Sequence, residues 1–214
     1  MTAVALGISS GHIAPWAGEL RYAMSAESAS PPLLRAPLAR LRRRREAGLV
    51  RDAQRGSEEA IEELFRRHWR RAHRAAYVVI GDGPAAEDIA QESFLAAIRS
   101  LDRFDRRRPF GPWLHRITVN RAIDFARARK LRAESALSET IEGEAAIREG
   151  LSEEVMIALA ALSPEHRAVV VLRHLLGYTP GEIAKVLGLP RGTVNSRLRR
   201  ALDHLRPAIE REDG

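Results

Sequence analysis

The chain has 214 residues, a length that fits one domain or two small ones. Hydrophobic residues make up 45% of it, enough for a core, whereas the 29% of charged residues and the lack of any apolar run of about 18 residues exclude a membrane-inserted protein. The formal net charge of +7 indicates a polyanionic partner, most simply nucleic acid, and the absence of cysteine excludes disulfides and thiolate chemistry.

Ala, Leu, Arg and Glu are frequent and aromatic residues are few, which predicts an all-α chain. Residues 1–50 hold many Ser, Gly and Pro without a sustained period, so we expect a disordered N-terminal tail, within which Met24 is a second candidate for the first residue. The basic run Arg42–Arg45 fits the solvated start of a helix better than an arm that binds nucleic acid.

A first helical domain is expected over residues 51–132. Ser57 suits an N-cap for a helix to about Ile80, and Pro84 opens a second helix, with one acidic face, to about Leu101. A loop then leads to an arginine-rich third helix, over about residues 112–131. The residues expected to be buried are Ala60, Ile61, Leu64, Phe65, Trp69 and Ala72 in the first helix and Ile89, Phe94, Leu95 and Ile98 in the second.

The charge reverses after the third helix. Residues 133–151 are rich in Glu, Ser and Gly and lack an apolar stripe, which predicts a flexible acidic linker. A second helical domain follows over residues 152–210, in which Ser163 and Pro164 begin a helix that runs to Leu175. Its core is expected to include Leu151, Val155, Ile157, Leu159 and Leu162.

Residues 179–201 predict a helix–turn–helix. Thr179 and Glu182 form a capping-box pattern around Pro180, and Gly188 permits a left-handed cap before the second helix starts near residues 190–192. The second helix has a buried stripe of Val194, Leu198, Ala201, Leu202 and Leu205. Its other side carries Thr193, Ser196, Arg199 and Arg200, flanked by Asn195 and Arg197. This pattern favours binding in a DNA major groove over a plain helical hairpin with a solvated basic face.

Five segments carry a more specific signal in their order and spacing: residues 86–94, 113–124, 162–167, 182–184 and 192–201. With them, the chain resembles the extracytoplasmic-function (ECF) sigma factors, the small two-domain specificity subunits of bacterial RNA polymerase. The resemblance covers about residues 53–206. It implies that residues 51–132 are sigma region 2, which docks on core RNA polymerase and opens the −10 element, and that residues 152–210 are region 4, which reads the −35 element of promoter DNA.

The resemblance also implies roles for individual residues. It assigns polymerase binding to Asp88, Gln91, Glu92 and Phe94. It assigns binding of the −10 element to Arg103, Phe104, Arg116, Asn120, Arg121, Asp124 and Arg127. It assigns binding of the −35 element to Arg191, Thr193, Asn195, Ser196, Arg197, Arg199 and Arg200. Asn195 occupies a position where the family often has a basic residue. We expect a cytoplasmic protein that is monomeric when free, with an anti-sigma factor as a further partner in many relatives.

Two other classes of protein compete with this interpretation. A DNA-binding regulator that works without polymerase has no need for the acidic docking segment 87–94 or for the Trp113–Asp124 helix. An enzyme needs an active site, and the histidines His68, His73, His166 and His174 lack the spacing of a metal-binding motif, while no phosphate-binding or nucleophile motif is present. We therefore expect no catalytic residue, no cofactor and no metal.

Overall fold

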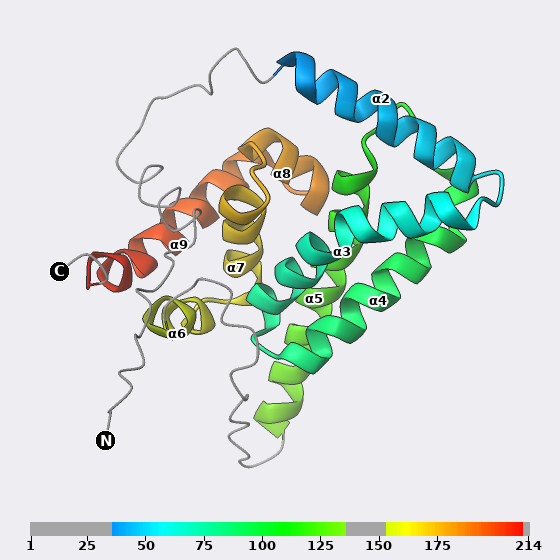
Figure 1. The fold of residues 1–214 in the computed structure, drawn as a ribbon. Helices are drawn as coiled ribbons and strands as arrows, with labels where there is room; N and C mark the ends of the chain where they lie inside the picture. The colour runs from blue at the N-terminus through cyan, green and yellow to red at the C-terminus, as the bar shows by residue number, and fades with distance from the viewer. Residues whose placement is uncertain (1–35, 136–152, 212–214) are drawn as a thin grey trace, which may run out of the picture.

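The structure, a computed structural model, describes residues 36–135 and 153–211, and within these ranges it is helical and contains no strand. The first block consists of α2 (Ala36–Ala53), α3 (Glu58–Ile80), α4 (Gly83–Arg99), a short 3₁₀ turn (Leu101–Arg103) and α5 (Phe110–Ser135) (Figure 1). The second block consists of α6 (Glu153–Ala161), α7 (Pro164–Val170), a π-helical turn (Val171–Leu175), α8 (Pro180–Leu187) and α9 (Arg191–Arg211). The all-α prediction is confirmed.

Short-range signals in the sequence set the helix ends. The Ser57 side chain accepts a hydrogen bond from the backbone N–H of Ala60, and Asp82 caps α4 in the same way through Ala85. Between these two helices Gly81 adopts a left-handed φ of 70°, which a side chain would strain. The turn at residues 81–82 therefore folds α4 back against α3.

The first block has an apolar core between α2, α3, α4 and α5. Phe94 and Phe110 are buried there, and the rings of Trp113 and Phe104 lie 4.4 Å apart, tilted by 30°. The aliphatic residues buried with them are Val50, Ala53, Ala60, Leu64, Ala72, Ala97, Leu101 and Leu114. This core holds the start of α5 and the loop before it in place.

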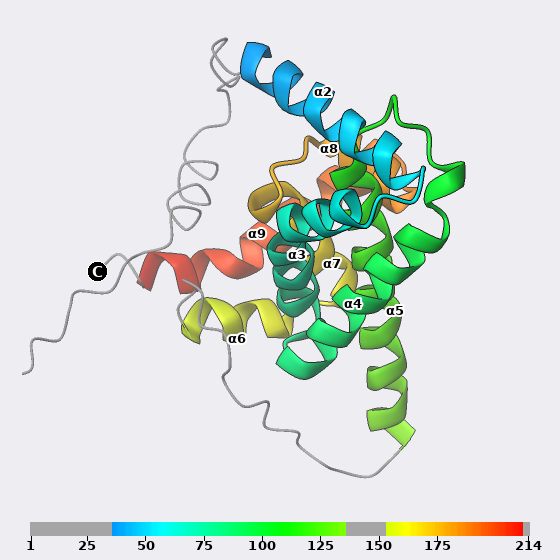
Figure 2. The ribbon, with the colours of Figure 1, turned by 45° about the vertical axis from the view of Figure 1, so that its right-hand side comes forward.

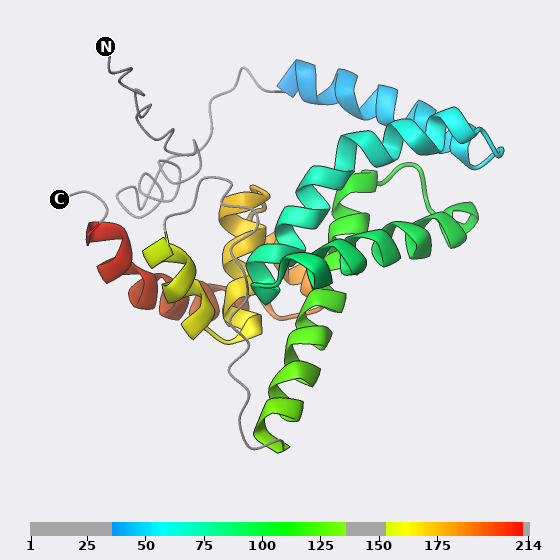
Figure 3. The same ribbon diagram turned by 60° about the horizontal axis from the view of Figure 1, so that its bottom comes forward.

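A second core joins the two blocks. One side of α3 and α5, including Val79 and Val119, packs against α7 and α8, while α6 lies along α9 (Figure 2). The residues of the second block buried in this core include Val155, Leu159, Leu172, Ile183, Val194, Leu198 and Leu205. The last turns of α5 project beyond this contact (Figure 3). No helix of the described ranges is long and apolar enough to cross a membrane.

The structure corrects several predictions. The tail was expected to extend to residue 50, but a helix occupies Ala36–Ala53. The linker was expected to begin at residue 133, but α5 extends to Ser135. Four residues expected to be buried are exposed: Phe65 (38%), Leu95 (49%), Ile98 (36%) and Ile157 (64%). Their helices bury a narrower stripe than the sequence suggested, because neighbouring helices cover only one side of each. The rest of the predicted tail and linker, residues 1–35 and 136–151, lies outside the described residues.

Candidate functional site

The helix–turn–helix forms as predicted. The hydroxyl of Thr179 accepts from the backbone N–H of Glu182 at 3.3 Å, and a carboxylate oxygen of Glu182 accepts from the backbone N–H of Thr179 at 2.9 Å. Gly188 has a left-handed φ of 66°, which reverses the chain into α9. Ile183 of α8 and Val194 of α9 are fully buried. The N-terminal half of α9 is thus presented on a rigid support.

The outer face of α9 is cationic. Arg191, Asn195, Arg199 and Arg200 are exposed, and Thr193, Ser196 and Arg197 are half-buried. The Ser196 hydroxyl donates to the Thr193 carbonyl at 3.0 Å. Within the described residues, no carboxylate forms an ion pair with any of the four arginines of this face, so their charge is available to a ligand. Of the seven residues predicted for the −35 element, all lie on one helix and the four most exposed include three arginines.

The predicted −10 residues on α5 are less available. Arg121 donates to Glu92 of α4 at 2.6 Å. Arg127 donates to Glu165 of α7 at 2.6 Å and lies 3.9 Å from Asp124. Burial alone would raise the pKa of Glu165, but the hydrogen bonds it accepts, including that from Arg127, outweigh burial and lower the pKa below its ordinary value.

The other predicted −10 residues divide by exposure. Arg103 and Arg116 are exposed and Asn120 is half-buried on the same side of α5 as Arg116. Phe104 is buried in the core of the first block, so it supports the loop from beneath. Arg129 was not predicted; it donates to the carbonyl of Ile80 at 2.9 Å and caps the end of α3.

The predicted docking face lies on α4. Asp88, Gln91 and Glu92 are exposed, whereas Phe94 is buried and packs against Phe65 at 4.9 Å. Leu95 and Ile98 fall on the same side of the helix as the acidic residues, because they follow at helical spacing. The face is therefore amphipathic, and its apolar part was missed because an apolar residue at helical spacing reads equally as core or as a surface for a partner.

A buried hydrogen bond, also missed, joins the two blocks. His115 Nδ1 of α5 and the Tyr178 hydroxyl, just before α8, are 2.7 Å apart. Burial lowers the pKa of His115 to about 3 and raises that of Tyr178, so both are neutral near pH 7. The two residues are 63 positions apart and no motif links them, so only the fold shows the pair.

No group of three or more His, Asp or Glu side chains that could hold a metal ion occurs in the part of the chain that the structure describes. The candidate surfaces predicted from the sequence are therefore the α9 face, the α5 face and the acidic face of α4.

Comparison with known proteins identifies the family of the chain. Residues 64–132 match the family described as Sigma-70 region 2, and residues 152–205 match Sigma-70, region 4. The chain is 30% identical over 176 residues to the ECF RNA polymerase sigma factor SigW of Bacillus subtilis, which covers 75% of this chain and 94% of that protein. The chain belongs to the ECF sigma factors. As an ECF sigma factor it binds bacterial core RNA polymerase and directs transcription initiation at specific promoters, with a −10 and a −35 element.

Two further matches cover about three quarters of this ECF sigma factor and nearly the whole length of the matched protein. The ECF RNA polymerase sigma-E factor of Salmonella typhimurium is 35% identical over 188 residues, covering 76% of this chain and 95% of that protein. The solved structure of CnrH in complex with the cytosolic domain of CnrY is 30% identical, with a TM-score of 0.58, and covers 77% of this chain and 97% of that chain. The region 2 match lies within the first block, after α2, and the region 4 match covers most of the second block.

Proposed function

We propose that this sigma factor divides promoter recognition between two helices and keeps polymerase docking on a third. The exposed arginines on the outer face of α9, which bind no carboxylate among the described residues, carry this assignment, because a rigid cationic helix after a capped turn fits the major groove of the −35 element. Arg199 and Arg200 are assigned to guanine edges or phosphates, and Thr193 and Ser196 to close approach to the groove.

Region 2 is assigned the −10 element and the polymerase. On α5, Arg116 and Arg121 hold phosphates and Asn120 reads a base edge, since an amide offers both a donor and an acceptor. On α4, the acidic residues and the neighbouring Leu95 and Ile98 dock on the polymerase: the charges steer a basic partner and the apolar pair is buried on contact. Phe94 and Phe104 support these surfaces from within the core.

Promoter geometry requires the two regions to separate. Elements centred on positions −35 and −10 lie about 25 base pairs apart, or about 85 Å along the duplex. A compact unit of about 160 residues has a radius of gyration near 15 Å and is therefore about 40 Å across. The packed arrangement, in which α5 and α7 share an ion pair, does not span this distance. We infer that both the His115–Tyr178 hydrogen bond and the Arg127–Glu165 ion pair break when the holoenzyme forms.

Partners and activity follow from the same assignment. CnrH was solved with the cytosolic domain of CnrY. By analogy we propose an anti-sigma factor as a further partner of this chain, one that favours the packed arrangement. We also propose that the protein has no catalytic activity of its own and acts in the cytoplasm, where RNA polymerase and the chromosome are found.

Run-off transcription tests the assignment. Core polymerase supplied with this protein is expected to produce defined transcripts from genomic fragments, and core polymerase alone is not. Equal initiation with and without the protein would overturn the proposed function. Mapping the transcript starts would identify the two promoter elements.

A further inference from the structure

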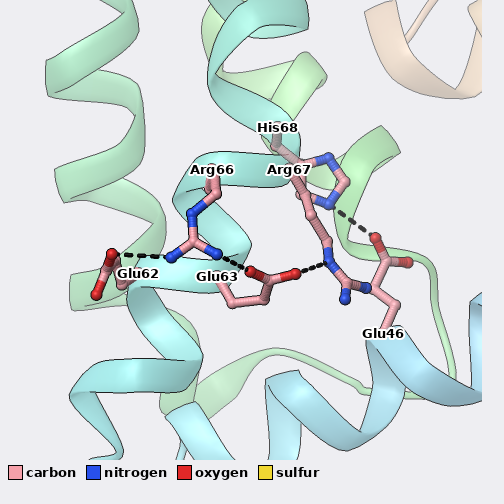
Figure 4. Close-up of polar contacts among 6 residues, drawn as sticks. All are labelled: Glu46, Glu62, Glu63, Arg66, Arg67 and His68. Carbon is pink, nitrogen blue, oxygen red and sulfur yellow. Dashed lines mark hydrogen bonds and ion pairs between the residues drawn. The ribbon is translucent and has the colours of Figure 1, made fainter.

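Helix α2 precedes the part of the chain that matches region 2, which begins at residue 64. Its residue Glu46 contacts two other helices of the first block. The Glu46 carboxylate lies 2.8 Å from His68 Nε2 of α3, and both side chains are largely shielded from solvent (Figure 4). The same carboxylate accepts a hydrogen bond from the backbone N–H of Phe110, the first residue of α5. Glu46 thus ties α2 both to α3 and to the start of α5.

The Glu46 carboxylate is ionised. Burial alone would raise its pKa, but the hydrogen bond and charge of His68 and the backbone N–H of Phe110 outweigh burial and lower the pKa below its ordinary value. Arg67 of α3 adds a weaker attraction while it is bound to Glu63 at 2.6 Å (Figure 4). A negative charge at the first turn of a helix also interacts favourably with the helix dipole, so Glu46 stabilises the start of α5.

His68 lies against the first turns of α5, close to His115. A Cβ placed on Gly111 would lie 3.2 Å from His68 Cε1 and 3.9 Å from His115 Cε1, so the two imidazole rings flank the same position of the backbone. The lack of a side chain at residue 111 permits His68 to approach α5 this closely. His115 is only 4% exposed, and its Nε2 has no hydrogen-bond partner among the described residues. The position of His68 therefore affects how well His115 is shielded from water.

The other nitrogen of His115 reaches the second block. His115 Nδ1 lies 2.7 Å from the hydroxyl of Tyr178, just before α8. Burial is the main cause of the raised pKa of Tyr178; the charges of Glu182 on α8 and Glu46 on α2 add to it, while Arg71 on α3 opposes it. A chain of contacts thus runs from α2 through α3 and α5 to the segment before α8, and the charge of α2 is felt at its far end.

We propose that α2 is a latch on the packed arrangement of the two regions. While Glu46 holds His68 and the start of α5, His115 stays shielded and hydrogen-bonded to Tyr178. When α2 leaves, His68 loses its carboxylate partner and turns toward solvent, which lets water reach His115 beside Gly111. A hydrated imidazole has water as an alternative partner, so the hydrogen bond to Tyr178 contributes less to packing. Release of α2 therefore favours separation of region 4 from region 2.

A double-mutant cycle in the free, full-length protein tests this latch with E46A, Y178F and E46A/Y178F. The chain has no cysteine, so one cysteine introduced at an exposed position of α4 and one on α9 carry fluorescent labels. Fluorescence transfer at a low, fixed urea concentration gives the ratio of separated to packed molecules. E46A is expected to raise this ratio about fivefold in the wild-type background and less than about 1.5-fold in the Y178F background, because effects within one network are not additive. Equal factors in both backgrounds would overturn the latch.

Q54A is the matched control. Gln54, directly after α2, donates to the carbonyls of Leu101 and Phe104 at 2.9 and 3.0 Å, so it also ties this part of the chain to the first block, without contacting His68. Q54A is expected to leave the ratio within about 1.5-fold. A rise as large as that of E46A would mean that any loosening of region 2 opens the molecule, and Glu46 would be no latch.

E46Q keeps the test available if circular dichroism shows that E46A does not fold. Its amide oxygen still accepts from the backbone N–H of Phe110, but the charge is lost. The ratio of separated to packed molecules is expected to rise in E46Q by less than in E46A, and again only where Tyr178 is present. A rise in E46Q that is the same in the Y178F background would contradict the latch.

A second measurement follows the His115 side chain by NMR titration. In the wild type its pKa is about 3, so it should stay neutral between pH 5 and pH 8. In E46A its pKa should rise toward the ordinary value near 6.5, because water reaches the ring, and His115 should titrate within this range. Q54A should behave like the wild type. A His115 that stays neutral in E46A would overturn the path from α2 to the contact between the regions.

The outcomes distinguish this inference from the proposed function, on which it rests only in taking separation of the regions as the active step. If E46A and Y178F act independently while the wild-type protein directs specific initiation, the latch fails and the proposed function stands. If the wild-type protein directs no specific initiation while the two substitutions remain coupled, the proposed function fails and the latch stands.

Discussion

The arginines on α5 and those on α9 face different electrostatic surroundings. On α5, Arg121 and Arg127 each bind a carboxylate, from Glu92 and Glu165 respectively. On α9, Arg199 and Arg200 are exposed and bind no carboxylate among the described residues. A carboxylate competes with a phosphate for the same guanidinium group. The proposed −35 face is therefore accessible to DNA in the packed arrangement, whereas part of the proposed −10 face is occupied.

The two ion pairs on α5 also differ from each other. Arg121 and Glu92 both belong to region 2, so their ion pair survives any movement of region 4. Arg127 and Glu165 belong to different regions, so their ion pair breaks when the regions separate. Under the proposed function, separation of the two regions releases one arginine of the proposed −10 face for DNA. The predictions below change first the exposed arginines of α9, then the contact between regions 2 and 4, and last the Arg127–Glu165 ion pair.

The largest effect is expected on α9. Replacing Arg199 and Arg200 with Ala should weaken promoter binding by about 1–3 kcal/mol for each arginine that reads a base. The fold should hold, because exposed substitutions usually change stability by no more than about 0.5 kcal/mol. Filter binding of holoenzyme to promoter DNA measures the first and thermal unfolding the second. R206A, further along α9, is the control and should bind normally; unfolding of R199A/R200A would instead make these arginines structural.

Lowering the pH should destabilise the contact between regions 2 and 4 before it affects the arginines of α9. His115 is buried and neutral, with a pKa of about 3 against an ordinary value near 6.5, so the unfolded chain binds a proton that the folded chain excludes. Stability contributed by neutral His115 is thus complete above pH 6.5 and lost as the pH falls toward 3. About 2 kcal/mol should be lost at pH 5. His174, with a pKa of about 4, adds a loss in the same direction.

Denaturant unfolding at pH 7 and pH 5 measures this loss. The variant H115Q, which does not titrate, is the comparison. It should show a smaller difference between the two pH values than the wild type. An equal difference in both proteins would mean that His115 is accessible to protons in the folded state.

Removing the tyrosine hydroxyl should have a slightly smaller effect. The Y178F variant leaves His115 Nδ1 without its partner, and Nε2 already lacks one among the described residues, which costs about 1–3 kcal/mol for a buried polar group. The packed arrangement is destabilised but both regions stay folded. Fluorescence transfer between labels on α4 and α9 should show a larger distance in Y178F. An unchanged distance would mean that the apolar core alone holds the regions together.

Whether the sequence predicts a structural feature depends on how far apart along the chain the interacting residues lie. The Thr179–Glu182 capping box, the Ser57 cap and the glycine at 188 act over three or four residues, so their patterns were sufficient. The exposure of Leu95 and Ile98 was not predictable, because helical spacing does not distinguish a core face from a face for a partner. The His115–Tyr178 hydrogen bond and the pairing of Arg127 with Glu165 depend on how two regions pack, and neither leaves a local pattern. Family resemblance predicts which surfaces bind the partners, and the fold shows which of the charges on them are already bound.

The smallest effect is expected from E165Q. This variant tests most directly the difference between the carboxylate-bound arginines of α5 and the exposed arginines of α9. Arg127 is 55% exposed in its side chain, so the ion pair contributes at most about 1 kcal/mol, and its loss should raise the affinity of the free protein for single-stranded −10 DNA by no more than about fivefold. The gain should vanish in an R127Q background, because the released arginine is what binds the phosphate.

E92Q is the control within region 2: it frees Arg121 to a similar degree but leaves the distance between labels on α4 and α9 unchanged, whereas E165Q increases it. If E165Q raised DNA affinity equally with and without Arg127, the gain would come from the lost negative charge alone, and Glu165 would not compete with DNA for this arginine.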